Sequence, residues 1–186
     1  MGQIWITSDW HLNHNKEFIY KARGFETVSD MNKAIMQNHN QSVTMDDHIY
    51  VLGDCCLGQD LDNARALMCQ MKGHLHIIRG NHCTDTRIEM YKGLWNVEEV
   101  VEAKYLTYKK YHFFLSHYPA LCSNFDTNRS LKQRTLNLCG HSHTTDAFAD
   151  WDKYGAPIVH CEADAWGCAP VPLDHIIELM KERVNE

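Results

Sequence analysis

The stretch IWITSDWH, residues 4–11, decides the fold, because a short apolar run ends abruptly in side chains that can bind a metal. Runs of this length, rich in β-branched and aromatic residues and closed by glycine or polar residues, are typical of buried strands. The same transition recurs in IYVLGD (49–54), IIRGNH (77–82), FFLSH (113–117) and LNLCGHSH (136–143). The sequence therefore predicts five strands that each end in Asp, Asn or His.

The polar residues at these five ends are expected to meet, because ligands of α/β sheets bind beyond the carboxyl ends of the strands. Each short motif is weak alone, since an Asp after a strand is often only a turn residue. Five such motifs in one chain would require five coincidences, so together they predict a transition-metal site. The side chains are Asp9, His11, Asp54, Asn81, His82, His117, His141 and His143.

The rest of the chain predicts further strands and several helices. Apolar residues at helical spacing and capping residues indicate helices over residues 27–44, 60–71, 84–91 and 173–184. Additional strands are expected at 97–101, 104–108 and 157–161. The first half alternates strand and helix, which favours a parallel sheet, whereas the second half is mostly strand. This mixture predicts an α/β protein with two packed sheets and helices outside them.

Length, charge and cysteine usage exclude several classes of protein. We expect residues 1–186 to form a single domain that is cytoplasmic and makes no membrane contact, because the chain has no spanning apolar stretch and its first strand begins almost at Met1. A net charge of −6 disfavours binding along long nucleic acid, although a nucleotide substrate stays open. The eight cysteines form no C-x-x-C pair, which disfavours a structural zinc protein and predicts reduced thiols.

The ordered set D-x-H, G-D, G-N-H, H and G-H-x-H resembles the calcineurin-like metallophosphoesterases. It spans residues 9–143, and the short chain looks like the small, uncapped bacterial and phage-type members. The resemblance implies a four-layer α-β-β-α sandwich, in which two mixed β-sheets pack face to face and are flanked by helices. It also implies a cofactor of two divalent transition-metal ions, with Mn²⁺ expected and Fe, Ni²⁺ or Zn²⁺ possible given the mixed nitrogen and oxygen ligands.

The resemblance also implies a role for each residue. Asp54 would bridge the two ions, since a carboxylate has two oxygens and can span two cations. His82 would be catalytic and would not bind metal, stabilising charge on the phosphate or protonating the leaving alkoxide. The first ion would be held by Asp9, His11, Asp54 and His143, and the second by Asp54, Asn81, His117 and His141.

Cys83 departs from the family pattern, which usually has Asp or Glu after G-N-H. The missing carboxylate leaves the orientation of His82 to another hydrogen-bond partner. Candidate substrate contacts are His14, Arg129 and His160. We expect residues 12–26 and 118–134 to wall the site.

These roles predict a phosphoesterase that hydrolyses a P–O ester bond by in-line attack of a metal-bound hydroxide. The substrate would be a small phosphoester or a nucleotide, and a phosphodiester is favoured over a monoester by resemblance to the small uncapped members. The alternatives are a phosphomonoesterase acting on a small phosphorylated metabolite or nucleotide, and a non-catalytic scaffold that keeps the fold. A scaffold predicts eroded ligands, and none of the eight positions is eroded.

Overall fold

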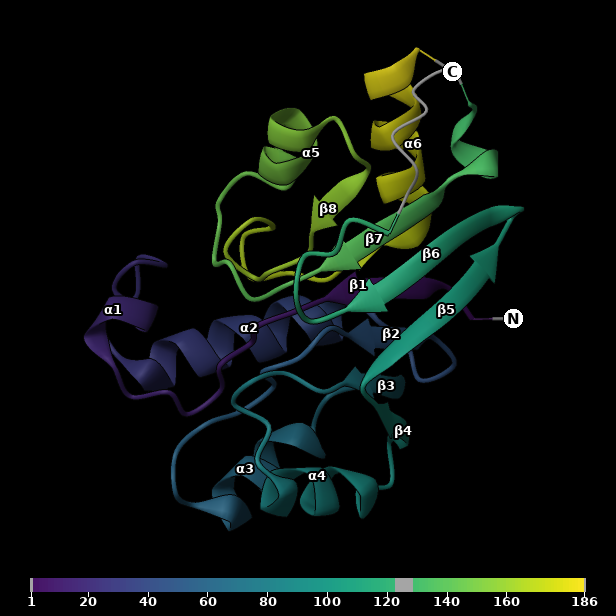
Figure 1. The fold of residues 1–186 in the computed structure, drawn as a ribbon. Coiled ribbons are helices and arrows are strands. Elements are labelled where there is room, and N and C mark those ends of the chain that lie inside the picture. Colours follow the sequence, from purple (N-terminus) through teal and green to yellow (C-terminus); the bar gives the residue numbers. More distant parts are fainter. Residues whose placement is uncertain (1, 123–128, 186) are drawn as a thin grey trace.

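The computed structural model describes residues 2–122 and 129–185, and within them nine strands form two sheets (Figure 1). The five-stranded sheet has the order β4 (Val97–Val101), β3 (His74–Ile78), β2 (His48–Val51), β1 (Ile4–Thr7) and β9 (Val171–Pro172). The four-stranded sheet has the order β5 (Ala103–Tyr108), β6 (Tyr111–Ser116), β7 (Thr135–Cys139) and β8 (Ile158–His160). Every strand expected from the apolar runs is present.

Both sheets are mixed. Strands β1 to β4 are parallel and β9 pairs with β1 in the antiparallel direction. In the other sheet β5 and β6 are antiparallel, whereas β6, β7 and β8 are parallel. The chain changes sheets at Glu102, between β4 and β5. Strand β9 was not predicted, because two residues are too few to show an alternating pattern.

The helices begin close to the positions that their caps predict. Thr27 accepts a hydrogen bond from the backbone N–H of Asp30 at the start of α2 (Val28–Ser42), and Asp60 caps α3 (Leu61–Met68) in the same way. Helix α3 ends at Met68, three residues before the predicted end at residue 71. Tight turns after Met68 then lead the chain to Gly73. The other helices are α1 (Glu17–Tyr20), α4 (Asp85–Lys92), α5 (Ala149–Tyr154), α6 (Leu173–Val184) and a 3-10 turn, η1 (Leu131–Gln133). Of these, α1, α5 and η1 were not predicted.

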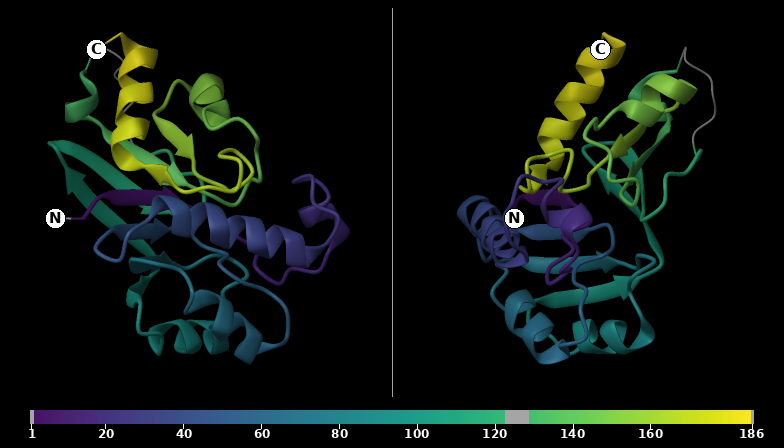
Figure 2. Two further views of the ribbon diagram at one scale, coloured as in Figure 1. Left: turned by 180° about the vertical axis from the view of Figure 1, so that it is seen from behind. Right: turned by 90° about the vertical axis from the view of Figure 1, so that its left-hand side faces the viewer.

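The two faces of the five-stranded sheet enclose separate apolar cores. Helices α2, α3 and α4 cover one face, where Ile35 and Met68 pack against Ile49 (Figure 2). The opposite face meets the four-stranded sheet, where Leu52 packs among residues that include Phe113, and α6 contributes to this same core. Helix α5 lies beside β8. Two mixed sheets packed face to face with flanking helices confirm the predicted fold class.

The carboxyl ends of β1 and β2 are tied together beyond the sheet. The backbone N–H of Asp9 donates to the carbonyl of Gly53 at 3.1 Å, and that of His11 donates to Asp54 at 3.0 Å. In the four-stranded sheet, the backbone N–H of Gly140, after β7, donates to the carbonyl of His117, after β6, at 2.9 Å. Between the two sheets, His117 Nδ1 donates to the carbonyl of Leu52 at 2.8 Å. Strand ends from both sheets therefore converge on one region. In the described part of the chain, helices are too short or too polar to cross a bilayer.

Candidate metal centre

Five of the seven predicted metal ligands have a backbone conformation that side-chain-bearing residues rarely adopt. A positive φ brings Cβ close to the neighbouring backbone and is strained for an L-residue. Such strain persists only where the surrounding structure enforces it, and it concentrates at functional sites. The five residues and their φ angles are Asp9 (53°), His11 (51°), Asp54 (47°), His141 (76°) and His143 (50°).

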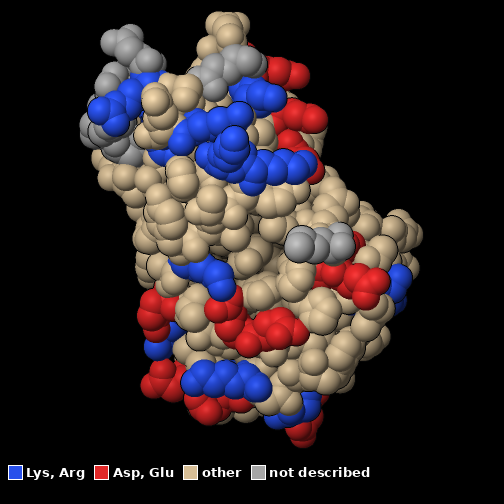
Figure 3. Space-filling view, turned by 90° about the vertical axis from the view of Figure 1, so that its right-hand side faces the viewer, with Lys and Arg blue, Asp and Glu red and all other residues tan. Residues whose placement is uncertain are grey.

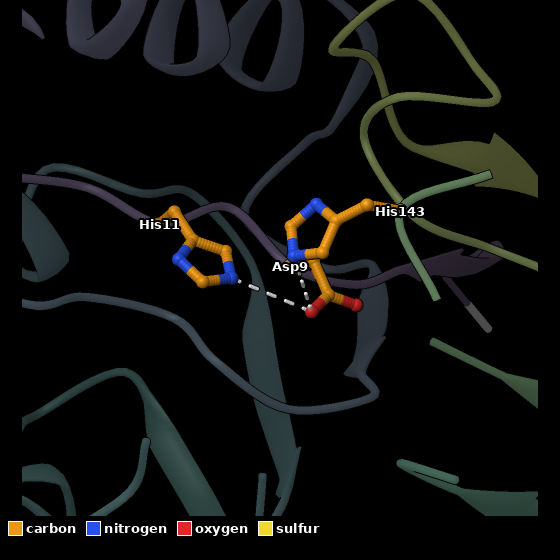
Figure 4. A group of neighbouring side chains, drawn as sticks. All are labelled: Asp9, His11 and His143. Carbon is orange, nitrogen blue, oxygen red and sulfur yellow. Dashed lines mark ion pairs between the residues drawn. The ribbon is translucent and has the colours of Figure 1, made fainter. Parts of the chain in front are cut away.

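The first cluster of ligand atoms contains Asp9, His11 and His143 (Figure 4). Asp9 Oδ2 accepts hydrogen bonds from Ser8 Oγ at 2.6 Å and from the backbone N–H of His141 at 2.9 Å. Asp9 Oδ1 instead faces His11 Nε2 at 3.5 Å and His143 Nε2 at 3.7 Å. Burial opposes ionisation of Asp9, but these hydrogen bonds and nearby histidines hold its pKa below the ordinary value. The carboxylate therefore presents one oxygen to two imidazoles.

The second cluster contains Asp9, Asp54 and His117, and the amide oxygen of Asn81 connects it to His141. His117 Nδ1 donates to the carbonyl of Leu52 at 2.8 Å, so the neutral imidazole carries its lone pair on Nε2. That nitrogen faces two further acceptors, Asn81 Oδ1 at 2.8 Å and Asp54 Oδ2 at 3.5 Å. His141 Nδ1 lies 3.0 Å from the same Asn81 oxygen. A cation placed among these acceptors would relieve their mutual repulsion.

Asp54 lies between the two clusters. Its Oδ2 is 3.8 Å from His11 Nε2 in the first cluster and 3.5 Å from His117 Nε2 in the second. Its Oδ1 accepts a hydrogen bond from the backbone N–H of His82 at 2.9 Å, which fixes the orientation of the carboxylate. One oxygen of Asp54 thus faces ligand atoms on both sides.

The distances and the unpaired atoms both fit bound divalent ions. Metal bonds of roughly 2.1 Å at tetrahedral angles separate two ligand atoms by about 3.4 Å, whereas hydrogen bonds are mostly shorter than about 3.2 Å. The charged contacts above lie between 3.5 and 3.8 Å. Among the described residues, Asp9 Oδ1 and His11 Nε2 are buried and make no hydrogen bond. Native proteins seldom leave buried polar atoms unpaired, so these two atoms favour a metal ligand role.

Two glycines allow the strand ends to approach this closely. A Cβ at Gly80 would collide with the carboxylate of Asp54, and a Cβ at Gly140 would collide with Ser8 and Asp9. Each glycine directly precedes a predicted ligand, Asn81 or His141. The G-N-H and G-H-x-H motifs therefore have a steric reason for their first residue.

Arg23 and Asp164 support the first cluster, and the sequence had not indicated this role for either. Asp164 Oδ2 accepts a hydrogen bond from His143 Nδ1 at 2.9 Å, which leaves Nε2 available as a ligand. Arg23 pairs with the same carboxylate at 2.7 Å and donates to the carbonyl oxygen of Asp9 at 2.8 Å. Burial opposes ionisation of Asp164, but His143 and Arg23 hold its pKa well below the ordinary value. Asp164 follows β8 closely, so the strand-end criterion applied to β8 could have found it.

His160, expected to contact substrate, is instead enclosed in the protein. Its side chain is 1% exposed and does not line the cleft over the two clusters. Its Nδ1 contacts Glu162 at 3.0 Å and its Nε2 contacts Asp150 at 3.2 Å. Glu162 also accepts the backbone N–H of Ser142 at 3.1 Å, between the two histidines of G-H-x-H. This position favours a structural role for His160, which supports that turn through Glu162.

A cleft of about 510 Å³ opens over the two clusters, and His82 lines it as an exposed side chain. Cys83 is buried, with its sulfur 4.0 Å from Asp54 Oδ1. Among the described residues, the His82 ring lies next to the imidazoles of His11 and His14. His14 lines the same cleft and contacts His11, with 2.8 Å between their Nδ1 atoms. Burial, together with the neighbouring histidines, lowers the pKa of His14 to about 4, so its imidazole is neutral at pH 7.

The two segments expected to wall the site differ. Segment 12–26 supplies His14, Phe18, Ile19 and Ala22 to the cleft. Within 118–134, residues 123–128 lie outside the described residues, and the described ones do not line the cleft. Arg129 is one of the described residues of segment 118–134 that do not line the cleft, and it is exposed. Its substrate contact therefore stays a prediction.

Similar proteins include one sequence relative and two solved structures, the first of which shares this architecture. The chain is 29% identical to an uncharacterized protein of Methanocaldococcus jannaschii, over 98% of this chain and 93% of that protein. A crystal structure of a protein of unknown function from Aquifex aeolicus superposes with a TM-score of 0.73 at 19% identity, covering 96% of this chain and all of that one. An archaeal phosphodiesterase superposes with a TM-score of 0.47 at 14% identity, covering 88% of this chain and 86% of the other.

A model of the calcineurin-like phosphoesterase superfamily domain matches residues 3–154. The match includes all eight predicted site residues from Asp9 to His143, and it ends before Asp164. The chain therefore belongs to the calcineurin-like phosphoesterase superfamily, whose members are metal-dependent hydrolases of phosphoesters.

Proposed function

We propose that this protein hydrolyses phosphodiesters with two divalent ions, held on either side of Asp54. The observation that carries the proposal is the position of Asp54 Oδ2, which faces His11 Nε2 at 3.8 Å and His117 Nε2 at 3.5 Å. A carboxylate oxygen that faces ligand atoms on both sides suits a two-ion site, and Asp9 also belongs to both clusters. We assign Asp9, His11, Asp54 and His143 to one ion, and Asp54, Asn81, His117 and His141 to the other.

Two such ions, when bound, activate water near neutral pH and neutralise the charge that develops during in-line displacement at phosphorus. The protein keeps its ligand atoms in position through hydrogen bonds behind them. The carbonyl of Leu52 orients His117, and the carboxylate of Asp164 orients His143. Both histidines therefore present Nε2 in the correct tautomer before any ion binds.

His82 is the group that we assign to proton transfer. It lines the open cleft, and its ring centroid lies 5.5 Å from that of His11. Its backbone N–H donates a hydrogen bond to Asp54 Oδ1, which fixes the backbone of His82 next to that carboxylate. As the P–O bond to the leaving group breaks, the His82 ring is placed to pass a proton to the departing oxygen.

The charges around the cleft favour a diester over a monoester. The described residues that line the cleft include no Lys or Arg. A phosphodiester carries one negative charge, whereas a monoester carries up to two near neutral pH. The second charge would have to be neutralised by the ions and histidines alone. We therefore assign the diester as substrate and treat the monoester as the competing outcome.

The experiment is a hydrolysis panel on protein stripped of metal and then supplied with Mn²⁺. Bis(p-nitrophenyl) phosphate, p-nitrophenyl phosphate and a 2′,3′-cyclic nucleotide are compared at the same enzyme concentration, with metal content measured in parallel. Mn²⁺-dependent cleavage of a diester that exceeds cleavage of the monoester supports the proposal. Faster cleavage of the monoester overturns the assignment of substrate. Two bound ions without cleavage of any ester point to the scaffold.

A further inference from the structure

One wall of the cleft is apolar, and the proposed phosphodiester chemistry does not account for it. Phe18 is 70% exposed, more than any other large apolar side chain among the described residues. Other large apolar side chains are also exposed, such as Trp95 at 62%, but Phe18 is the one of this group that lines the cleft. Ile19 and Ala22 continue the same wall. We call these three residues the apolar shelf.

The shelf is held in place by contacts on both of its sides. Ile19, itself part of the shelf, is mostly buried, and the next residue of helix α1, Tyr20, also belongs to the apolar core. Arg23 follows directly and is fixed by its ion pair with Asp164 at 2.7 Å. Phe18 is thus an exposed aromatic ring on an anchored segment. Such a ring loses little conformational freedom when a ligand packs on it.

The shelf is continuous with the metal centre through a series of imidazole rings. The Phe18 ring stands edge-on to that of His14, with centroids 5.8 Å apart. His14 in turn stacks on His11 at 5.0 Å and lies 6.0 Å from His82. A phosphate bound at the two clusters would therefore have its substituent beside His14 and Phe18. The cleft, at about 510 Å³, falls within the range of roughly 300–1,000 Å³ that is usual for small-molecule sites.

We propose that the apolar shelf binds a flat aromatic substituent of the substrate, such as a nucleobase, by stacking on Phe18. A planar ring suits a wall made of Phe18 and an adjacent imidazole, because aromatic rings stack face to face or pack edge to face. Stacking on one aromatic side chain also accepts every base, since each base has a π-face. The inference deepens the proposed function by naming the class of substituent next to the phosphate, and it rests on that function only for the position of the phosphate.

The test is direct binding, which does not depend on catalysis. Calorimetry on the Mn²⁺-loaded protein compares adenosine 5′-monophosphate with ribose 5-phosphate, which lacks only the base. We expect the nucleotide to bind on the order of 10-fold more tightly, in the range that one base–aromatic stack provides. Phe18→Ala should remove this preference, whereas Phe18→Tyr should keep it. Trp95→Ala, which removes an exposed aromatic ring outside the cleft, is the matched control and should leave it unchanged.

Several outcomes would overturn the inference. Equal affinities in the wild type, no binding of either compound, or a preference that survives Phe18→Ala would each do so. Tighter binding of hexyl phosphate than of the nucleotide would assign the shelf to an alkyl chain instead. The proposed function is tested separately. If no ester is hydrolysed although the nucleotide preference depends on Phe18, the proposed function is wrong and the role of the shelf stands. If a diester is hydrolysed but Phe18→Ala leaves the nucleotide preference unchanged, the role of the shelf is wrong and the proposed function stands.

Discussion

Histidines gather at both ends of the parallel strands, and the two groups differ in their partners. At the carboxyl ends, His11, His117 and His143 face carboxylate oxygens at 3.5 to 3.8 Å. At the starts of the strands, His74 Nδ1 contacts Glu98 at 2.6 Å and His76 Nδ1 contacts Glu99 at 2.6 Å. Acidic and basic side chains lie next to each other on the lower half of the molecular surface in Figure 3.

The difference shows that the number of histidines does not define a metal site. In the second group the carboxylates lie at hydrogen-bond distance, so the protein itself satisfies Nδ1 of His74 and His76. Glu99 also pairs with Lys104. In the first group the Nε2 atoms lie 3.5 to 3.8 Å from the carboxylates of Asp9 and Asp54, too far for hydrogen bonds, and two buried atoms have no partner among the described residues. We therefore expect a cation to bind in the first group and none to bind in the second.

The largest expected effect is that of Asp54→Ala. We expect the protein to lose both ions and its phosphodiesterase activity, with a loss greater than the roughly 10–100-fold that outer hydrogen-bond partners contribute. The measurement is metal content by mass spectrometry together with the rate on the preferred ester. Glu99→Ala removes a carboxylate from the second group, and it should change neither the metal content nor the rate. Wild-type metal content in Asp54→Ala would disprove the bridging role.

His82→Ala separates the ligands from the proton-transfer group. We expect full metal content and a rate that is lower by about 10²–10⁴-fold, because a general acid is lost while the ligand atoms remain. Esters with a weakly basic leaving group should suffer least, since their oxygen needs no proton. If metal content collapses, His82 is itself a ligand.

Asp164→Ala tests the hydrogen bond behind His143. We expect metal affinity to fall by roughly 10–100-fold, the usual effect of losing the partner that orients a ligating histidine. The metal affinity is measured by titrating the metal-free protein with Mn²⁺. Glu98→Ala is the matched control, because it also removes a carboxylate from an imidazole Nδ1, but in the second group. An equal effect of both variants, or none of either, would remove the distinction between the two groups.

His39 shows what burial alone does to an imidazole. Its Nε2 donates to the carbonyl of Lys72 at 2.9 Å, Nδ1 has no partner among the described residues, and burial lowers the pKa to about 4. The unfolded chain binds a proton near pH 6.5 and the folded chain only near pH 4. Stability is therefore complete above the higher value and is lost as pH falls to the lower one.

We expect His39 to account for about 2 kcal/mol of the stability lost between pH 7.5 and pH 5. Urea unfolding at the two pH values measures this loss in the wild type and in His39→Gln. The difference between the two pH values should shrink in the variant, whatever its absolute stability. An unchanged difference would show that His39 is not the group responsible.

The smallest expected effect is that of His74→Ala. Its side chain is 41% exposed, and its ion pair with Glu98 lies at the surface, where such pairs contribute about 0–1 kcal/mol. We expect unchanged activity and metal content and a change in unfolding free energy of less than about 1 kcal/mol. A loss of bound metal in this variant would mean that the second group also holds an ion.

The sequence predicted the strands and the side chains at their ends because both are local signals. Asp54 and His117 each follow an apolar run within two residues, and parallel strands within a sheet carry such residues to the same edge of that sheet. The fold class follows from the same runs and from the order of the motifs. The short elements β9, α1 and α5 were not predicted, because two to six residues show no measurable periodicity.

Only the tertiary structure decided which atoms are satisfied and which are left for an ion. Arg23 and Asp164 are separated by 141 positions, and no local pattern connects them. The run before His160 predicted a strand, but packing turned His160 into the protein and Asp164 toward His143. His74 and His76 occupy alternate positions along β3, yet 41% of the His74 side chain is exposed and only 12% of the His76 side chain. Composition and spacing determine which ligand types are available, whereas hydrogen bonding between distant segments determines which of them remain free to bind a metal.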